Sequence, residues 1–267
     1  MKMRMTKTLL SKVGSYEFLA EPFHCDYSQH LFMGHLGNHL LNAADFHSND
    51  RGYGMSVLGP QHRTWVLSRL AIEMESMPKA YDHFTVETWV ESVMKFFTSR
   101  NFAISASDGS VLGYGKSVWA MIDTQSRQPV DIFSINDGLI KEYVEAEKPC
   151  PIAKSGRVKV TADAELVRTI DTYYNDVDVN GHINSIKYIE HVLDLFDIDF
   201  YKANRLKRLE VAYVAETYQG DKLSFYREEI APLEYAIKVV KIKKETQETI
   251  EVCRILMNFV KDRKKIW

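Results

Sequence analysis

The stretch NDVDVNGHIN, residues 175–184, gathers side chains that could act on a carbonyl group. Asp178, Asn180 and His182 bring a carboxylate, an amide and an imidazole close together in sequence. A histidine can carry or orient protons near neutral pH, and a carboxylate can hold it in place. An amide can donate a hydrogen bond to a developing negative charge. This composition favours an active site, but a calcium loop and a simple turn are competing interpretations.

The calcium interpretation rests on the opening of the stretch. Oxygen ligands at alternate positions and a glycine at the sixth match an EF-hand loop: Asp176, Asp178, Asn180 and Gly181. The twelfth position needs a bidentate glutamate but holds Lys187, a cation. The preceding residues 167–174 are rich in β-branched and aromatic side chains and lack the apolar stripe of a helix. We therefore expect no metal at this stretch.

The turn interpretation is harder to set aside, because Asp, Asn and Gly are the usual residues of turns and helix N-caps. A cap needs one such residue. Here acidic, amide and imidazole side chains occupy alternate positions: Asp176, Asp178, Asn180, His182 and Asn184. The stretch also directly precedes a helical pattern, where free N–H groups and the positive end of the helix dipole lie. This placement suits polarisation of a carbonyl.

A base that activates water is expected on the strand that follows this helix. Glu216, in the sequence YVAET, comes after a strand predicted at Leu209–Ala215. A sheet that wraps this helix would return the strand beside the start of the helix. The alternative, a surface carboxylate at the end of a strand, stays open because exposed glutamates are common.

An internal repeat divides the chain into two parts with one plan. The segment from Arg69 resembles the segment from Arg208 at a constant spacing of 139 residues, which also relates Asp82 to Asp221. At this spacing the counterpart of Glu216 is Met77. The first part also has no counterpart of the Asp-x-Asn-x-His sequence, so only the second part is predicted to be catalytic.

Helical and strand patterns follow the same plan in each part. A helix is predicted at Asn38–Phe46, and a clearer one has an apolar stripe: Ile186, Ile189, Val192, Leu193 and Phe196. Strands follow, including 101–106 and 111–118 around an Asp-Gly hairpin turn, and alternating residues from Ile237 to Phe259. The predicted fold class is α+β, a tandem (double) hotdog in which each antiparallel sheet wraps a long helix.

The predicted domains are an N-terminal hotdog at residues 1–148 without catalytic groups, and a C-terminal hotdog at residues 149–267 that carries them. The join falls in the segment EAEKPCPIAKSG, residues 145–156, where prolines, a glycine and charges interrupt both periodicities. One copy alone would leave an edge strand and an open apolar groove, which a second copy can cover.

Composition restricts the partners and the compartment. The 267 residues are 45% hydrophobic and 26% charged with a formal net charge of −2, which gives no indication of nucleic-acid binding. Cys25, Cys150 and Cys253 are odd in number and far apart, which indicates a reducing compartment. The N-terminus lacks the apolar core of a signal peptide, and no apolar run is long enough to span a membrane. We expect a cytoplasmic protein without membrane insertion.

The motif DVDVNGHINSIKYIEHVLD resembles the hallmark of the acyl-acyl carrier protein (acyl-ACP) thioesterases, a family of plant plastids with bacterial members. Segments of the first part, NHLLNAADFH, the stretch from TWVLSRL to TWVES, and SVWAMID, resemble the family in order and spacing. The likeness runs from about Phe18 to Val260. It implies a double hotdog with four catalytic residues: Asp178, Asn180, His182 and Glu216. No transit peptide precedes the motifs, which favours a bacterial-type member, and Thr217 replaces the cysteine of plant members.

The resemblance implies hydrolysis of a fatty acyl-ACP thioester to free fatty acid and holo-carrier protein, by water attack and without a cofactor. Glu216 would activate or position the water, and Asp178 and His182 would orient and tune the site. Asn180 and N–H groups at the helix start would stabilise the oxyanion. An apolar tunnel would hold the acyl chain, with its far end in the first part.

The implied partner is acyl carrier protein, which is acidic. A group of basic residues surrounds the catalytic helix and strand in sequence: Lys187, Lys202, Arg205, Lys207 and Arg208. They could dock the carrier, or they could be an ordinary solvated surface. A homodimer is possible. The first alternative is an acyl-CoA thioesterase of the same fold. The second, less favoured alternative is a non-catalytic acyl-binding hotdog protein.

Overall fold

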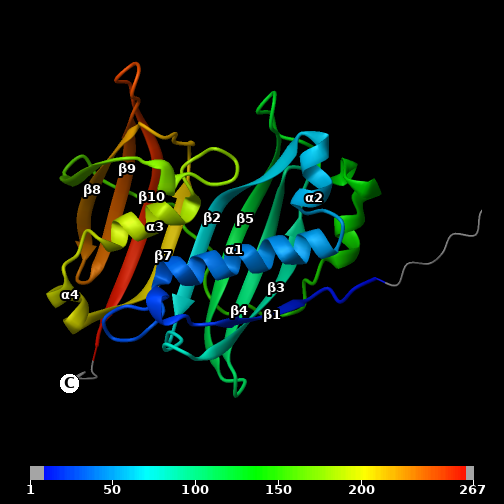
Figure 1. The fold of residues 1–267 in the computed structure, drawn as a ribbon, viewed down its shortest axis with the longest axis horizontal. Coiled ribbons are helices and arrows are strands. Elements are labelled where there is room, and N and C mark those ends of the chain that lie inside the picture. Colours follow the sequence, from blue (N-terminus) through cyan, green and yellow to red (C-terminus); the bar gives the residue numbers. More distant parts are fainter. Residues whose placement is uncertain (1–8, 263–267) are drawn as a thin grey trace, which may run out of the picture.

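One antiparallel sheet runs through the whole molecule in the computed structural model, which describes residues 9–262 (Figure 1). The strand order is β1-β3-β4-β5-β2-β7-β10-β9-β8-β6. The strands are β1 Gly14–Leu19, β2 Arg63–Met74, β3 His83–Val93, β4 Phe97–Ala106, β5 Val111–Asp123, β6 Glu165–Asp171, β7 Asn204–Tyr213, β8 Lys222–Ala231, β9 Glu234–Ile242 and β10 Thr249–Lys261. We call the part with β1 to β5 the first half and the part with β6 to β10 the second half.

Helices cover one face of this sheet. The α-helices are α1 Met33–Asp50, α2 Met55–Leu58, α3 Ser185–Leu193 and α4 Ile198–Ala203, and the 3-10 helices are η1 Pro22–His24, η2 Gly59–Gln61, η3 Ile132–Ser134, η4 Asn136–Tyr143 and η5 Tyr174–Asp176. Figure 1 shows α1 across the strands of the first half and α3 across those of the second. Each half is therefore a sheet with one central helix, and the predicted double hotdog is confirmed.

The two halves join through the strands that carry the sequence repeat. β2 and β7 pair antiparallel, with Arg69 opposite Ala212, Ala71 opposite Glu210, and Glu73 opposite Arg208. Ala71 and Glu210 are also related by the repeat spacing of 139 residues. Equivalent residues lie opposite each other only where a two-fold axis relates the strands, so a local pseudo-two-fold axis passes through this pair.

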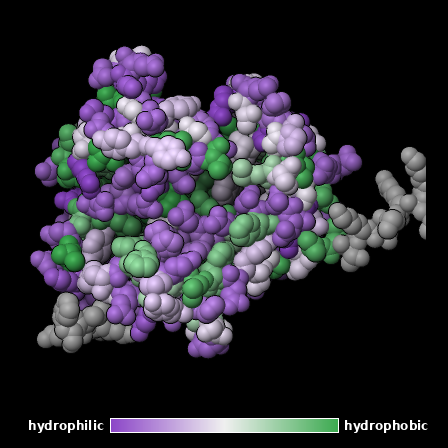
Figure 2. Space-filling model, in the orientation of Figure 1, coloured by the Kyte–Doolittle hydropathy of each residue, from purple (hydrophilic) through white to green (hydrophobic). Residues whose placement is uncertain are grey.

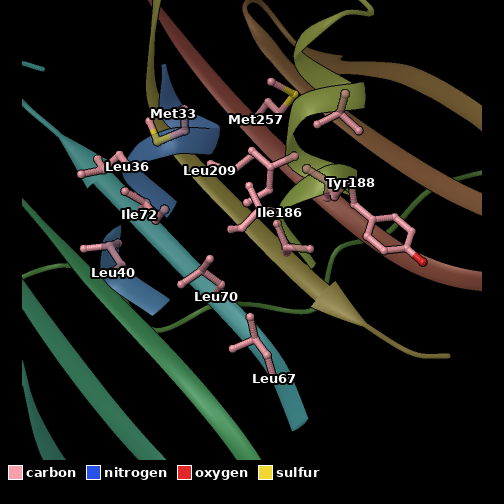
Figure 3. Packing of buried hydrophobic residues seen from close by; sticks show 14 of the residues in the cluster. Met33, Leu36, Leu40, Leu67, Leu70, Ile72, Ile186, Tyr188, Leu209 and Met257 are labelled. Atoms are coloured by element: carbon pink, nitrogen blue, oxygen red, sulfur yellow. The ribbon is translucent and has the colours of Figure 1, made fainter. Parts of the chain in front are cut away.

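The two helices pack on the sheet and on each other, so the halves share one core (Figure 3). Leu36 and Leu40 of α1 lie over Leu70 and Ile72 of β2, while Ile186 of α3 lies over β7. Glycines on α1 allow this approach. A Cβ at Gly37 would lie 2.7 Å from a side-chain carbon of Ile186, closer than van der Waals contact permits.

Helix α3 is shorter than its apolar stripe predicted. It ends at Leu193, and a new helix, α4, begins after Asp197, whose side chain accepts the N–H of Phe200 at 2.8 Å. Phe196 leaves the helix and packs against Phe200 and Phe259, with ring centroids 4.7 and 5.1 Å away. Within residues 9–262, no helix is both long and apolar enough to cross a membrane.

The segment from 144 to 164 connects the halves without regular structure. Charged side chains of the second half hold it: Arg208 Nη2 donates to Ala153 O at 2.8 Å, and the N–H of Gly156 donates to Glu210 Oε2 at 2.9 Å. These contacts lie beside the β2–β7 seam. The boundary between residues 148 and 149 stays a prediction, although it falls inside this segment.

Candidate active site

The side chain of Asp178 folds the stretch 175–184 into a tight loop. Its Oδ1 accepts the N–H of Asn180 at 2.8 Å and that of His182 at 3.4 Å. The backbone N–H of Asp178 also donates to His182 O at 2.8 Å, and Gly181 at the tip has a φ of 81°. A strand, β6, and a single 3-10 turn lead into this loop, so the entering helix of an EF-hand is absent.

His182 and Glu216 meet at the end of β7. His182 Nε2 lies 3.2 Å from Glu216 Oε2, and the side chains are 19% and 29% exposed. The N–H of Ile183 donates to Thr217 O at 2.8 Å, which ties the loop to the turn that follows β7. Sequence placed these residues on different elements, and the fold brings them together.

A buried lysine on β9 supports the turn that carries Glu216. Lys241 Nζ donates to the backbone O of Glu216 and lies 3.8 Å from Asp221 Oδ2. Asp221 Oδ2 in turn accepts the N–H of Tyr218 at 3.1 Å. Lys241 and Asp221 are only 5% and 7% exposed, so this ion pair fixes the backbone from inside.

The first half contributes a cation that the sequence analysis missed. Arg127 Nη2 hydrogen-bonds to Glu216 Oε1, while His182 faces the other carboxylate oxygen. Arg127 lies in the turn after β5, where Asp123 Oδ1 accepts the N–H groups of Gln125 and Ser126. An isolated arginine in a turn carries no signal of this role, because its partner is 89 residues away.

Most N–H groups before α3 are already occupied, which corrects the expectation of several free donors. Those of residues 180–184 donate to Asp178, Thr217 or Asp176, and that of Ile186 donates to Asn184 Oδ1 at 2.8 Å. In the stretch 180–186 this leaves the N–H of Ser185, the first residue of α3, as a donor for a ligand.

Thr217, the residue at the plant cysteine position, is fully buried. Its Oγ1 accepts the hydroxyl hydrogen of Tyr188 at 2.8 Å, and burial raises the pKa of this phenol. Burial likewise raises the pKa of the Cys253 thiol. Neither the Thr217 hydroxyl nor the Cys253 thiol is placed as a nucleophile beside His182. In residues 9–262, no cluster of three or more His, Cys, Asp or Glu side chains could hold a metal ion.

A cavity of about 1050 Å³ opens beside these groups and extends between the halves. Figure 2 shows the surface hollowed at this junction. Its second-half wall includes Asp178, Asn180, His182, Ser185 and Glu216. Its first-half wall comes from α1, α2, β2, β4 and β5: Leu41, Asp45, Ser48, Met55, Trp65, Leu67, Arg100 and Trp119 among others. The predicted apolar tunnel is thus only partly apolar, because polar side chains line its first-half part.

The basic residues around α3 and β7 are largely engaged within the chain. Lys187 pairs with Glu190 at 2.7 Å, Lys202 with Asp199 at 2.8 Å and Arg208 with Glu73 at 2.7 Å. Lys207 pairs with Glu75, and Arg205 donates to Met74 O at 3.3 Å. These contacts favour the interpretation of this group as a neutralised surface over that of a docking site.

Comparison with known proteins gives a consistent result over both halves. The family model for the acyl-ACP thioesterase N-terminal domain matches residues 14–143, and the model for the C-terminal domain matches residues 160–261. The solved acyl-ACP thioesterase from Bacteroides thetaiotaomicron is 48% identical, with a TM-score of 0.85 over 93% of this chain and 98% of that one.

More distant relatives share the fold or part of the sequence. The 12:0-ACP thioesterase from Umbellularia californica has a TM-score of 0.81 at 19% identity, over 96% of this chain and 100% of that one. The chloroplastic palmitoyl-acyl carrier protein thioesterase of Gossypium hirsutum is 25% identical over 191 residues, which is 68% of this chain and 46% of that protein. The chain thus spans less than half the length of this curated relative.

Proposed function

Because the chain belongs to the acyl-ACP thioesterase family, we propose that it hydrolyses fatty acyl-ACP to free fatty acid and holo-carrier protein. The observation that carries this proposal is the contact between His182 and Glu216 at 3.2 Å on the wall of a cavity that extends into the other half. A base beside an elongated cavity suits attack by water on the thioester at one end of a long chain.

Glu216 is the proposed general base. Arg127 and His182 each engage one of its oxygens, and each carboxylate oxygen has a second lone pair left for a water molecule. Glu216 takes a proton from this water as its oxygen attacks the thioester carbon. The proton then returns, by way of His182, to the sulfur of the departing phosphopantetheine thiolate. Asp178 holds the loop that positions His182.

The oxyanion of the tetrahedral intermediate needs fixed donors. We assign this role to the N–H of Ser185, which lies at the positive end of the α3 dipole, and to the side-chain amide of Asn180. Both residues line the same cavity as Glu216. A donor already in place before the reaction stabilises the developing charge without reorganisation.

No covalent intermediate is part of this mechanism. Thr217 Oγ1 accepts a hydrogen bond in a fully buried setting, and the three cysteines lie outside the cavity wall. In oxygen-18 water, the label should enter the fatty acid, and intact-protein mass spectrometry should find no acyl adduct during turnover. A stable adduct on Thr217 or on a cysteine would rule out direct attack by water.

The deciding experiment is thiol release from acyl-ACP and acyl-CoA substrates over a series of chain lengths. Release that is faster from the carrier protein supports the proposed substrate. Faster release from CoA would favour an acyl-CoA thioesterase, and no release from either would leave a binding protein. We also propose a cytoplasmic, reducing setting, which the three free cysteines support. The homodimer stays a prediction.

A further inference from the structure

The core of the first half changes from apolar to polar toward the C-terminal end of α1. Along the face of β4 that α1 covers, Ile104 and Phe102 are followed by Arg100 and Thr98. All four are at most 4% exposed. Buried polar residues of α1, of its C-cap and of β3 complete the cluster: His47, Ser48, Arg51 and Thr88. Arg100, Thr98 and Ser48 also line the cavity whose wall includes Glu216.

Within the described part of the chain, the hydrogen bonds of the Arg100 guanidinium go to hydroxyl groups. Nη1 donates to Thr88 Oγ1 at 3.2 Å, Nη2 donates to Ser48 Oγ at 2.9 Å, and the Tyr53 hydroxyl is close enough to interact. None of the ion pairs formed by residues 9–262 includes Arg100. A guanidinium has five N–H donors, so these neutral contacts leave capacity for an acceptor from the cavity.

The neighbouring titratable groups compensate the charge of Arg100 only in part. His47 is neutral, because burial first and then the charges of Arg100 and Arg51 lower its pKa to about 2. Asp45 lines the cavity nearby, and its carboxylate interacts with the charge of Arg100 without forming an ion pair among residues 9–262. It also accepts a hydrogen bond from the backbone of Met55, and burial raises its pKa. A buried charge is ordinarily paired or fully hydrogen-bonded, so this one suits a site completed by a ligand.

We propose that Arg100 and its hydroxyl neighbours form a polar subsite at the inner end of the acyl cavity. This subsite takes an acceptor oxygen at the far end of an acyl chain and excludes the end of a longer unsubstituted chain. A hydrocarbon that reaches Arg100 displaces water and leaves guanidinium donors without partners. A terminal hydroxyl or carboxylate oxygen restores those hydrogen bonds.

This inference rests on the proposed thioester hydrolysis, and the two have separate readouts. The substrates are saturated acyl-ACPs of increasing length and the same series with a terminal hydroxyl group. Thiol release from any member supports the hydrolysis. In the wild-type protein, kcat/KM of the unsubstituted series should fall beyond a limiting length. At that length the terminal hydroxyl should restore it by about tenfold to a hundredfold, the range for a hydrogen bond to a charged group.

Arg100→Met keeps much of the side-chain volume and removes the charge. It should abolish the advantage of the terminal hydroxyl and extend the unsubstituted series to longer chains. Arg51→Met is the matched control, because Arg51 is buried in the same cluster but donates to the carbonyls of Ser11 and His47 and does not line the cavity. It should lower stability without changing the preference between the two series.

If Arg100 were only a steric wall, the terminal hydroxyl would give no advantage at any length in the wild-type protein, and the proposal would fail. Equal selectivity changes in the Arg100 and Arg51 variants would also overturn it, since the effect would then follow disruption of the cluster. Should Arg100→Met not fold, the wild-type comparison of the two series still decides the question.

Discussion

The two halves use the space beneath their central helix in opposite ways. In the first half, α1 has 18 residues and the sheet beneath its C-terminal end borders the cavity. In the second half, α3 has 9 residues. Beyond its end, an aromatic cluster fills the space: Phe196, Phe200, Tyr201, Tyr235 and Phe259. The cluster itself borders a second, smaller pocket of about 680 Å³. We call the first half the hollow half and the second half the packed half.

This difference separates two requirements of the proposed reaction. A chain-binding site needs volume, whereas catalytic groups need neighbours that hold them in place. His182 and Glu216 are supported by the packed half through Ile183, Lys241 and Asp221. The hollow half supplies Arg127 across the junction. The proposed reaction would thus take most of its volume from the first half and most of the support for its catalytic groups from the second half.

The strongest test separates the halves physically. Residues 151–267 expressed alone should be insoluble or inactive, although they contain His182 and Glu216. Removal of the first half exposes β7 as an edge and uncovers the core face that α1 and β2 bury. Soluble yield and thiol release measure the outcome. A soluble second half with full activity would contradict the shared core.

The next test compares Glu216 with its repeat counterpart. Glu216→Gln should lower kcat by about a hundredfold or more, because the amide cannot take a proton from water. Met77→Leu, at the equivalent position of the first half, should change kcat by about twofold at most, since this swap nearly conserves volume. Steady-state thiol release measures both. Wild-type rates in a folded Glu216→Gln protein would remove this residue from the mechanism.

Ser185→Pro tests the proposed oxyanion donor without breaking α3. Proline is well tolerated at the first position of a helix, and Asn184 before it has φ −57° and ψ 136°, a conformation that proline accepts. Loss of this single N–H should lower kcat by about a hundredfold. Ser185→Ala, which keeps the N–H, should retain most activity. Equal losses in both variants would assign the effect to the hydroxyl.

Arg127→Met tests the contribution of the hollow half to the catalytic centre. We expect kcat to fall by about tenfold with a smaller change in KM, because the residue orients Glu216 and does not hold the chain. Arg127→Lys should recover part of the loss through its remaining charge. Arg63→Met is the control, since Arg63 donates to Ser134 away from Glu216. A rise in KM alone would place Arg127 in substrate binding.

The smallest effect concerns stability and pH. His47 has a folded-state pKa of about 2 against an ordinary value of 6.5, so below pH 6.5 the unfolded chain binds a proton that the folded chain does not. Stability is therefore lost as the pH falls through this range, by about 2 kcal/mol between pH 7 and pH 5. Denaturant unfolding of wild type and His47→Gln at both values measures it. An unchanged pH slope in the variant would contradict this account.

The proposed catalytic loop could be predicted from the sequence because its chemically active residues lie close together along the chain. Asp178, His182 and the start of α3 lie within one short stretch, and the apolar stripe from Ile186 marks the helix that they precede. The double hotdog could be predicted for the same reason, since each part of the chain shows its own helical and strand periodicity. Glu216 could be proposed because a hotdog fold returns its strand to the helix start.

The remaining features depend on contacts that no local pattern records. Arg127 meets Glu216 only because two turns from different halves converge. Arg100 occupies a core position of β4, and the pattern of alternation does not show that a cavity lies above it. Phe196 continues the stripe of α3 in sequence, but in the structure it lies beyond the end of the helix and packs against Phe200 and Phe259.

The seam between β2 and β7 also has a consequence for biosynthesis. The ribosome completes β2 long before β7 is made, so the edge of β2 in the first half stays unpaired during this time. Because the sequence of β7 resembles that of β2, the β2 strand of another newly made chain can pair with this edge in place of β7. Nascent chains made side by side on one messenger RNA can therefore pair through their β2 strands. The sequence likeness of β2 and β7 thus favours strand-swapped dimers as the product of misassembly.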